Sequence, residues 1–203
     1  MRYHDAFGKR RFSLPCYTLR HDARERKSMH FRQANVSDFA QIMGLYDEAS
    51  DAMRGTAYDC CWRRDGHPSQ DYVRGLVERG GMIVAEENGA LVGAVGFDHD
   101  LGHDYADASW LAGVPDELVC VVHLLVVGMN RRGEGLSREL LRACFLWARE
   151  QGMRTMRLDA TANNLPAISL YQSEGFVQVG AADLDVNPDG DSLVPFVVME
   201  RML

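Results

Sequence analysis

The sequence predicts one domain built on a mixed α/β sheet, and three observations support this prediction. Its length of 203 residues suits a single domain with a substantial core. The 46% hydrophobic and 25% charged residues are ordinary for a globular protein. Segments with the two-residue period of strands alternate along the chain with segments that have the period of amphipathic helices. We therefore expect helices packed against a central sheet.

The charge is distributed unevenly along the chain. Residues 1–28 hold eight Lys/Arg against three Asp/Glu, and the remaining residues hold 14 against 26. We therefore divide the chain into a basic N-terminal arm, residues 1–28, which is flexible or docked, and a patterned domain, residues 29–203. The acidity of the domain argues against a nucleic-acid partner and weakly favours a cationic substrate.

The sequence also argues against a membrane protein and against a metal-binding protein. No apolar run approaches the length of a membrane span, and the N-terminus lacks the apolar stretch of a signal peptide. The five cysteines lack C-x-x-C spacing, which favours reduced thiols over a disulfide framework or a zinc site. We expect a cytoplasmic protein without membrane contact or metal.

The first half of the domain is predicted to hold a strand, two helices and a hairpin. A short strand at 30–35 precedes a helix for which Ser37 is the expected N-cap. A second amphipathic helix follows Pro68. Two β-branched runs flank the dipeptide Asn-Gly at 88–89, which favours a two-residue hairpin turn.

The second half begins with the expected centre of the sheet. The stretch "LVCVVHLLVVG", residues 118–128, is almost uninterrupted in its apolar character, as in a strand buried on both faces. The remaining elements are expected to be a helix, a strand, a helix and two strands, at 136–151, 156–160, 164–175, 176–180 and 194–202.

A glycine turn joins this central strand to the next helix. In "MNRRGEGLSRELL", residues 129–141, two glycines stand one residue apart. A strand–turn–helix unit of this kind suits an anion, because free N–H groups and the helix dipole meet there. A Walker A loop is excluded because Glu134 stands where lysine is needed, and a dinucleotide fingerprint because Arg138 replaces the third glycine. By itself, the turn is most simply structural.

Two motifs together resemble those of the GCN5-related N-acetyltransferase (GNAT) superfamily. The pyrophosphate-binding motif R/Q-x-x-G-x-G/A is matched by Arg132, Gly135 and Ser137, although serine departs from the usual glycine or alanine. The stretch "NLPAISLYQSEGF", from Asn164 to Phe176, matches the element N-x-x-A-x-x-x-Y-x-x-x-G-F. The resemblance implies a mixed, mostly antiparallel central sheet of about seven strands flanked by about four helices.

The resemblance also implies a site for acetyl-CoA as cosubstrate. The end of the central strand would pair with the pantetheine arm, and one of its N–H groups would polarise the thioester carbonyl. The glycine turn would hold the pyrophosphate. Asn164 would hydrogen-bond the pantetheine or act as a plain N-cap. The residues implied in cofactor binding are Leu125, Val126, Val127, Arg132, Gly133, Glu134, Gly135, Leu136, Ser137 and Asn164.

Two residues are implied in proton transfer. Tyr171 matches the tyrosine that protonates the CoA thiolate in many relatives, and the alternative is an aromatic core residue. His123 lies on the same strand face as Val127 and is the candidate general base, with a hydrogen-bonded core histidine as the alternative. Glu117, acting through a water, is the second candidate base.

The sequence thus predicts an acetyl-CoA-dependent N-acetyltransferase acting on a small-molecule amine or a peptide N-terminus by direct attack. An acyltransferase that uses another acyl-CoA remains an alternative, as does a non-catalytic CoA-binding sensor or interaction protein. The acceptor surface is expected at 50–68, at 98–116 with His99 and His103, and at 183–191. Because dimers are common in the superfamily, a homodimer is an expected assembly.

Overall fold

The computed structural model describes residues 17–19, 29–102, 105, 107–187, 190 and 192–203. The strands are β1 (Tyr17–Leu19), β2 (Met29–Gln33), β3 (Met82–Glu87), β4 (Ala90–Asp98), β5 (Val119–Val127), β6 (Thr155–Thr161), β7 (Val177–Leu184) and β8 (Val194–Met202). The α-helices are α1 (Phe39–Met53), α2 (Gln70–Glu78), α3 (Leu136–Glu150) and α4 (Leu165–Ser173), and the short 3-10 helices are η1 (Val36–Asp38), η2 (Asp116–Leu118) and η3 (Met129–Arg131).

These strands form a single sheet in the order β1-β2-β3-β4-β5-β6-β8-β7. Every neighbouring pair is antiparallel except β5 and β6, which run parallel. The predicted mixed, mostly antiparallel sheet with four helices is therefore confirmed. The sheet has eight strands because Tyr17–Leu19 pairs with β2, adding an edge strand from within the predicted N-terminal arm. The other residues of that arm lie outside the described part of the chain.

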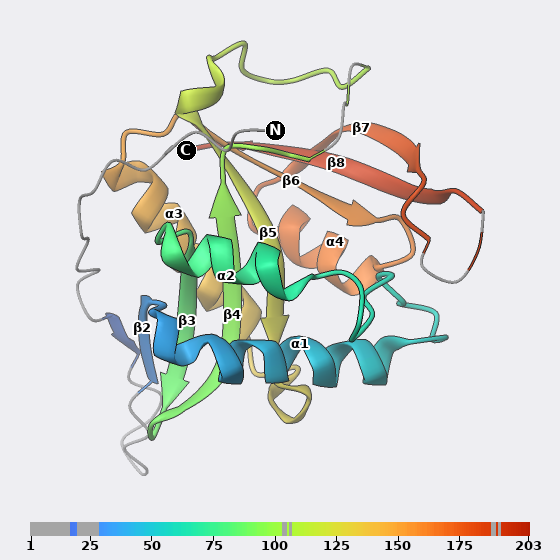
Figure 1. The fold of residues 1–203 in the computed structure, drawn as a ribbon. Helices are drawn as coiled ribbons and strands as arrows, with labels where there is room; N and C mark the ends of the chain where they lie inside the picture. The colour runs from blue at the N-terminus through green and yellow to red at the C-terminus, as the bar shows by residue number, and fades with distance from the viewer. Residues whose placement is uncertain (1–16, 20–28, 103–104, 106, 188–189, 191) are drawn as a thin grey trace.

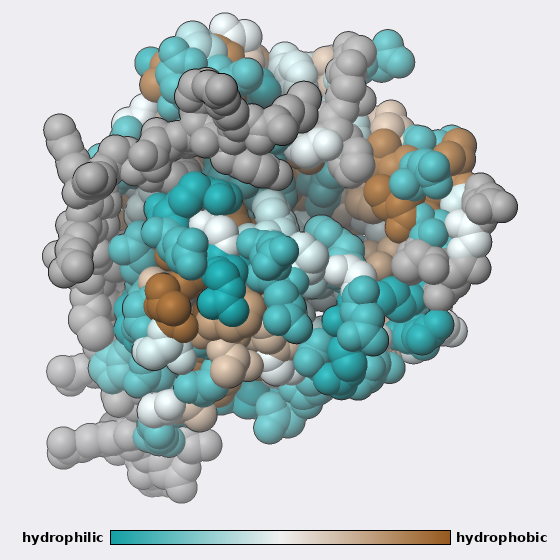
Figure 2. Space-filling view, in the orientation of Figure 1, coloured by the Kyte–Doolittle hydropathy of each residue, from teal (hydrophilic) through white to brown (hydrophobic). Residues whose placement is uncertain are grey.

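Helices cover both faces of the sheet. Helices α1 and α2 lie in front of the central strands in Figure 1, where their buried side chains form one core cluster with residues of β3, β4 and β5. Helices α3 and α4 contribute to a second cluster on the opposite face. Over α1 and α2 the molecular surface is mostly polar (Figure 2), as expected for amphipathic helices with the apolar stripe turned inward.

Two local predictions in the first half had different outcomes. The hairpin is confirmed, since Asn88 and Gly89 join β3 to β4 with φ of 53° and 81°. The prediction that Ser37 caps the first helix was wrong. Asn35 accepts from the Ser37 N–H, and Asp38 accepts from the Asn35 N–H, so a reciprocal capping arrangement starts the turn of η1 before α1 begins.

The helices also bear on membrane association. Within the described ranges, no helix is both long enough and apolar enough to span a bilayer.

Candidate active site

Strands β5 and β6 separate at the centre of the sheet. Their parallel register covers only Val119–Val121 against Thr155–Arg157. Beyond this point β5 remains paired with β4, and β6 remains paired with β8. The opening is a pocket of about 810 Å³, which is lined by both strands, α1, α4 and the loop that follows α1. Within the described part of the chain, this separation leaves one edge of β5 without a strand partner, and an extended ligand could pair with that edge.

A bulge in β5 lies at this opening. The β4–β5 register shifts between Ala94 and Gly96, and Leu124 opposite them has a φ of 54°. Positive φ is unusual for a branched side chain, so the surrounding structure must hold it. The hydroxyl of Tyr46 on α1 donates to the Leu124 carbonyl at 2.8 Å, and Tyr46 is only 1% exposed. Helix α1 therefore fixes the backbone at the pocket.

This contact gives a stability prediction. Replacing Tyr46 with Phe removes the donor and leaves the buried Leu124 carbonyl without it, so we expect the free energy of unfolding to fall by about 1–3 kcal/mol. Urea denaturation measures this change, and Tyr58→Phe, at an exposed tyrosine, is the control expected to change it by less than about 0.5 kcal/mol. Equal stability of the Tyr46 variant and the original chain would show that the hydrogen bond does not hold the bulge.

The glycine turn leads from η3 into α3. Gly133 and Gly135 have φ of 84° and 80°, a region that favours glycine, so the backbone conformation itself selects this residue. Apart from each glycine and its two chain neighbours, no described residue has an atom within 4 Å of the position where a Cβ would stand on Gly133 or Gly135. Gly135 caps α3 without a side-chain hydrogen bond, which leaves the helix N-terminus available to an anion. The turn thus fits a pyrophosphate group.

The ten residues implied in cofactor binding divide into two groups. Seven line the pocket, namely Leu125, Val126, Val127, Arg132, Gly133, Ser137 and Asn164. The pocket lining does not include the other three: Glu134 pairs with Arg131, Gly135 is the N-cap of α3, and the Leu136 side chain is buried in the core. Asn164 also accepts from the Ala167 N–H at 3.4 Å, so it caps α4 and faces the pocket at once.

His123 lines the same pocket beside an acid. Its Nε2 lies 2.9 Å from Oδ1 of Asp98, the last residue of β4, and both side chains are mostly buried. Burial alone would lower the pKa of His123, but the hydrogen bond and charge of Asp98 outweigh it and raise the pKa above its ordinary value. Burial would raise the pKa of Asp98, and His123 outweighs this to lower it. The two groups form a histidine–carboxylate pair that leaves Nδ1 as the second ring nitrogen.

Tyr171 projects from α4 into the pocket. It is 8% exposed and packs edge-on against Phe176, at 5.9 Å between ring centroids. Burial raises the pKa of its hydroxyl, and the charge of Asp159 acts in the same direction. The phenol therefore keeps its proton at neutral pH, which is the state that a proton donor requires.

Several residues that line the pocket were not predicted from the sequence, and two of them are Asp159 and Phe196. Asp159 on β6 lines it, accepts a hydrogen bond from the Tyr105 hydroxyl, and acts electrostatically on both His123 and Tyr171. An acid in the strand before the Asn164 motif was the only available signal. The second contributor is Phe196 on β8, which belongs to a strand predicted only as a structural element.

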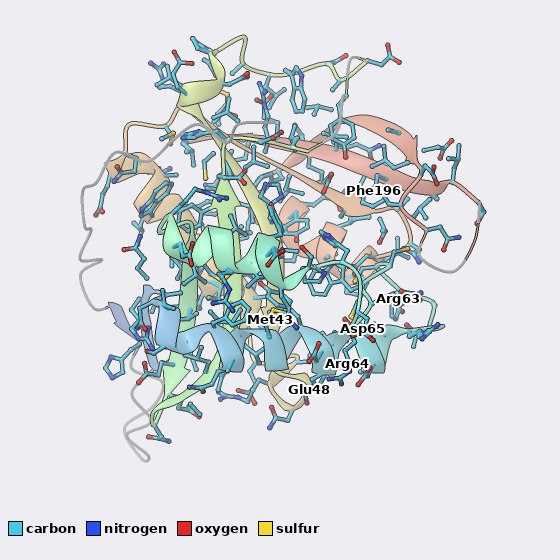
Figure 3. All side chains as sticks on the ribbon, viewed as in Figure 1. Met43, Glu48, Arg63, Arg64, Asp65 and Phe196 are labelled. Carbon is cyan, nitrogen blue, oxygen red and sulfur yellow. The ribbon has the colours of Figure 1, made fainter. Side chains whose placement is uncertain are left out.

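The loop after α1 forms another wall. Arg63 pairs with Asp59 at 3.0 Å, Arg64 pairs with Asp47 of α1 at 2.8 Å, and the Asn163 side chain donates to the Asp59 carbonyl. Figure 3 labels Phe196 on β8 above and Arg63 and Arg64 on this loop below. These contacts fasten the loop to α1 and to the start of α4. From the segment 50–68, for which the sequence predicts a border of the acceptor site, the pocket lining includes Tyr58, Cys60, Cys61, Trp62 and His67.

The other residues that the sequence offers for catalysis or substrate contact are Glu117, His99 and His103. Glu117 is exposed on η2 at the opposite end of β5 and is not part of the pocket lining. The ring of His99 bonds to the Val119 carbonyl at 2.6 Å, and His103 lies outside the described residues. Burial raises the pKa of Cys60 to about 12, so its thiol stays protonated. The described residues hold no cluster of three or more His, Cys, Asp or Glu suited to a metal ion.

Comparison with known proteins agrees with this geometry. The chain matches the sequence model of the Acetyltransferase (GNAT) family over residues 42–176. An uncharacterized N-acetyltransferase of Methanocaldococcus jannaschii is 26% identical over 152 residues, which are 74% of this chain and 61% of that protein. This chain therefore spans less than two thirds of the length of that relative.

Solved structures share the fold. An acetyltransferase of the GNAT family from Streptococcus agalactiae superposes with a TM-score of 0.71 at 19% identity, covering 93% of this chain and 98% of its own. A putative acetyltransferase from Salmonella typhimurium, solved with its cofactor acetyl-CoA, gives a TM-score of 0.64 at 23% identity, covering 86% and 94%.

The fold and the pocket together define a class of mixed α/β proteins. In this class, two parallel strands, here β5 and β6, separate at the centre of the sheet, and a glycine turn before a helix lies at the resulting pocket. Within that class, the chain belongs to the Acetyltransferase (GNAT) family.

Proposed function

We propose that this protein is an acetyl-CoA-dependent N-acetyltransferase in which the amine attacks the thioester directly. The observation that carries the proposal is one pocket that brings together the open edge of β5, the His123–Asp98 pair and Tyr171. Family membership supports the use of acetyl-CoA. Acetyl-CoA supplies the activated acetyl group, and the chain supplies binding, orientation and proton transfer.

Each part of the pocket has a proposed role. The turn from Arg132 to Ser137 holds the pyrophosphate, and the end of β5 from Leu125 to Val127 pairs with the pantetheine arm. Asn164 hydrogen-bonds that arm in addition to capping α4. A backbone N–H of β5 polarises the thioester carbonyl, and the bulge at Leu124 sets its direction.

Two side chains transfer protons in the proposed reaction. As the N–C bond forms, His123 in its neutral state accepts the proton of the amine at Nδ1, while Asp98 stabilises the charged ring through Nε2. As the C–S bond breaks, Tyr171 donates its proton to the thiolate. Asp159 is the alternative base, since its charge acts on both residues.

A panel of amines tests the proposed function. With acetyl-CoA present, release of free thiol should depend on the added amine, and mass spectrometry of the product should show one added acetyl group. Isothermal titration with acetyl-CoA, without amine, reports the cosubstrate site separately. Binding of acetyl-CoA without turnover of any amine would contradict the enzyme and favour the CoA-binding sensor, whereas faster turnover of another acyl-CoA would favour the other acyltransferase.

A homodimer and a cytoplasmic location remain predictions. Sedimentation velocity and cell fractionation would check them.

A further inference from the structure

The pocket is acidic at and around the reaction centre. Three carboxylates line it, from Asp98 at the end of β4, Asp100 just after it, and Asp159 on β6. Among the described residues that line the pocket, the only Lys or Arg is Arg132, which belongs to the glycine turn at the other end of the pocket. The proposed acceptor side therefore holds carboxylates without a lysine or arginine beside them in the lining.

Two of these carboxylates have neutral hydrogen-bond donors. Asp100 accepts from the Gly102 N–H at 2.8 Å, and Asp159 accepts from the phenol of Tyr105. Asp98 differs because it accepts from the His123 ring. A neutral donor orients a carboxylate without cancelling its charge. Asp100 and Asp159 therefore present negative charge to a ligand in the pocket.

A buried hydroxyl points to a ligand independently of the acids. Thr161 is 3% exposed and lines the same pocket, and among the described residues its Oγ1 has no hydrogen-bond partner. Thr161 and Asp159 are two residues apart on β6 and therefore share a face. Buried hydroxyls are normally hydrogen-bonded, so a donor from a ligand would complete this site.

Aromatic rings complete the walls around these acids. Phe196 on β8 lies directly across from Thr161 in the β6–β8 register. Tyr72 lies 6.2 Å from His123 between ring centroids, and Trp62 packs edge-on against Tyr46 at 5.4 Å. All three of Phe196, Tyr72 and Trp62 line the pocket. Aromatic faces beside carboxylates suit an organic cation, which gains from both the ring electrons and the negative charge.

The chemistry of the transfer decides which nitrogen these groups bind. An amine attacks only after it has lost its proton, so the reacting nitrogen is neutral and no longer attracted as a cation. The reacting nitrogen gains positive charge only briefly, between formation of the N–C bond and loss of its proton to the base. A second amine that stays protonated keeps its charge throughout, so carboxylates can bind it both in the ground state and in the transition state. We propose that the acceptor is a small dicationic amine, in which one nitrogen is acetylated and the other remains an ammonium bound by Asp100, Asp159 and Thr161. This proposal rests on the proposed function and names its substrate class.

Three amines of equal chain length test the charge preference. Butylamine, terminal diaminobutane and terminal aminobutyrate share a four-carbon chain. At the end away from the reacting amine, butylamine carries no charge, the diamine carries a positive charge and aminobutyrate carries a negative charge. We expect kcat/KM to be highest for the diamine, by about tenfold or more over butylamine, and lowest for aminobutyrate. Increasing ionic strength should reduce the ratio of diamine to butylamine, since salt screens partly exposed charges.

Variants locate the preference in the pocket. Asp100→Asn and Asp159→Asn should each reduce the diamine-to-butylamine ratio of kcat/KM toward one, whatever their effect on the absolute rate. Asp116→Asn is the matched control, because Asp116 is an exposed acid on η2 outside the pocket lining, and the ratio should not change. Thermal unfolding of each variant confirms that it is folded.

The outcomes separate this inference from the proposed function. Turnover of butylamine or aminobutyrate as fast as the diamine would overturn the dicationic acceptor and leave the acetyltransferase intact. If acetyl-CoA binds but no amine is acetylated, the proposed function fails, and calorimetry of the three amines with the protein–CoA complex then decides the inference. Tighter binding of the diamine supports the acidic site, and equal binding of diamine and butylamine overturns it.

Discussion

Replacing Tyr171 with Phe is expected to lower kcat by about 10²-fold or more, with little change in the affinity for acetyl-CoA. Phenylalanine keeps the ring that packs on Phe176 but lacks the hydroxyl that protonates the thiolate. Burial raises the pKa of this hydroxyl, so it is present as the neutral donor across the working pH range. Single-turnover kinetics and acetyl-CoA titration measure the two quantities separately.

A second substitution at Tyr171 distinguishes chemistry from packing. Tyr171→Ala removes both the hydroxyl and the buried ring, so it should reduce the free energy of unfolding by about 3–5 kcal/mol, whereas the Phe variant should remain close to the original stability. If the Phe variant turns over at the original rate and only the Ala variant is impaired, Tyr171 is a core residue and not the proton donor.

Removal of His123 is expected to have the other large effect. His123→Ala should lower kcat/KM by about 10²- to 10⁴-fold and abolish the rise of kcat/KM with pH, because the proposed proton acceptor is lost. In the original chain the ring must be neutral to accept a proton. The rate should therefore increase as the pH rises through the pKa of His123, which Asp98 holds above its ordinary value.

Asp98→Asn tests the cause of that shift. Burial lowers the pKa of His123, and the hydrogen bond and charge of Asp98 are the largest causes that raise it, followed by the charge of Asp159 and the Asp100 backbone. Without the charge of Asp98 the pKa of His123 should fall, so the acidic limb of the kcat/KM profile should move to lower pH. The Asn side chain can still accept from Nε2, which preserves the ring orientation. An acidic limb at the same pH in both proteins would assign it to another group, with Asp159 the next candidate.

Much of the fold follows from local patterns. The Asn-Gly turn at 88–89, the apolar run of β5 and the helical spacing in α3 all occur as predicted, because each depends on residues close in sequence. The cap of α1 was misplaced, since Asn, Ser and Asp all stand within four residues and only the hydrogen bonds distinguish them. The eighth strand was not predicted, because its pairing with β2 depends on residues distant from one another along the chain.

The candidate site was predicted where it follows sequence motifs and missed where it depends on distant contacts. Arg132, Asn164 and Tyr171, which the motifs single out, all line the pocket, whereas Glu117 lies at the far end of β5. Asp159 was overlooked because an acid within a strand has no motif of its own, and its contact with Tyr105 spans 54 residues.

By itself, the sequence determined the strand–turn–helix units and the turns that require glycine. Both depend on backbone conformation and side-chain periodicity within a few residues. The tertiary structure alone decided where the strands part and which charges meet. The Tyr46 hydroxyl reaches the Leu124 carbonyl across 78 residues, and His123 reaches Asp98 across 25. Such contacts form only when packed elements bring distant groups within hydrogen-bond range, so no local pattern encodes them.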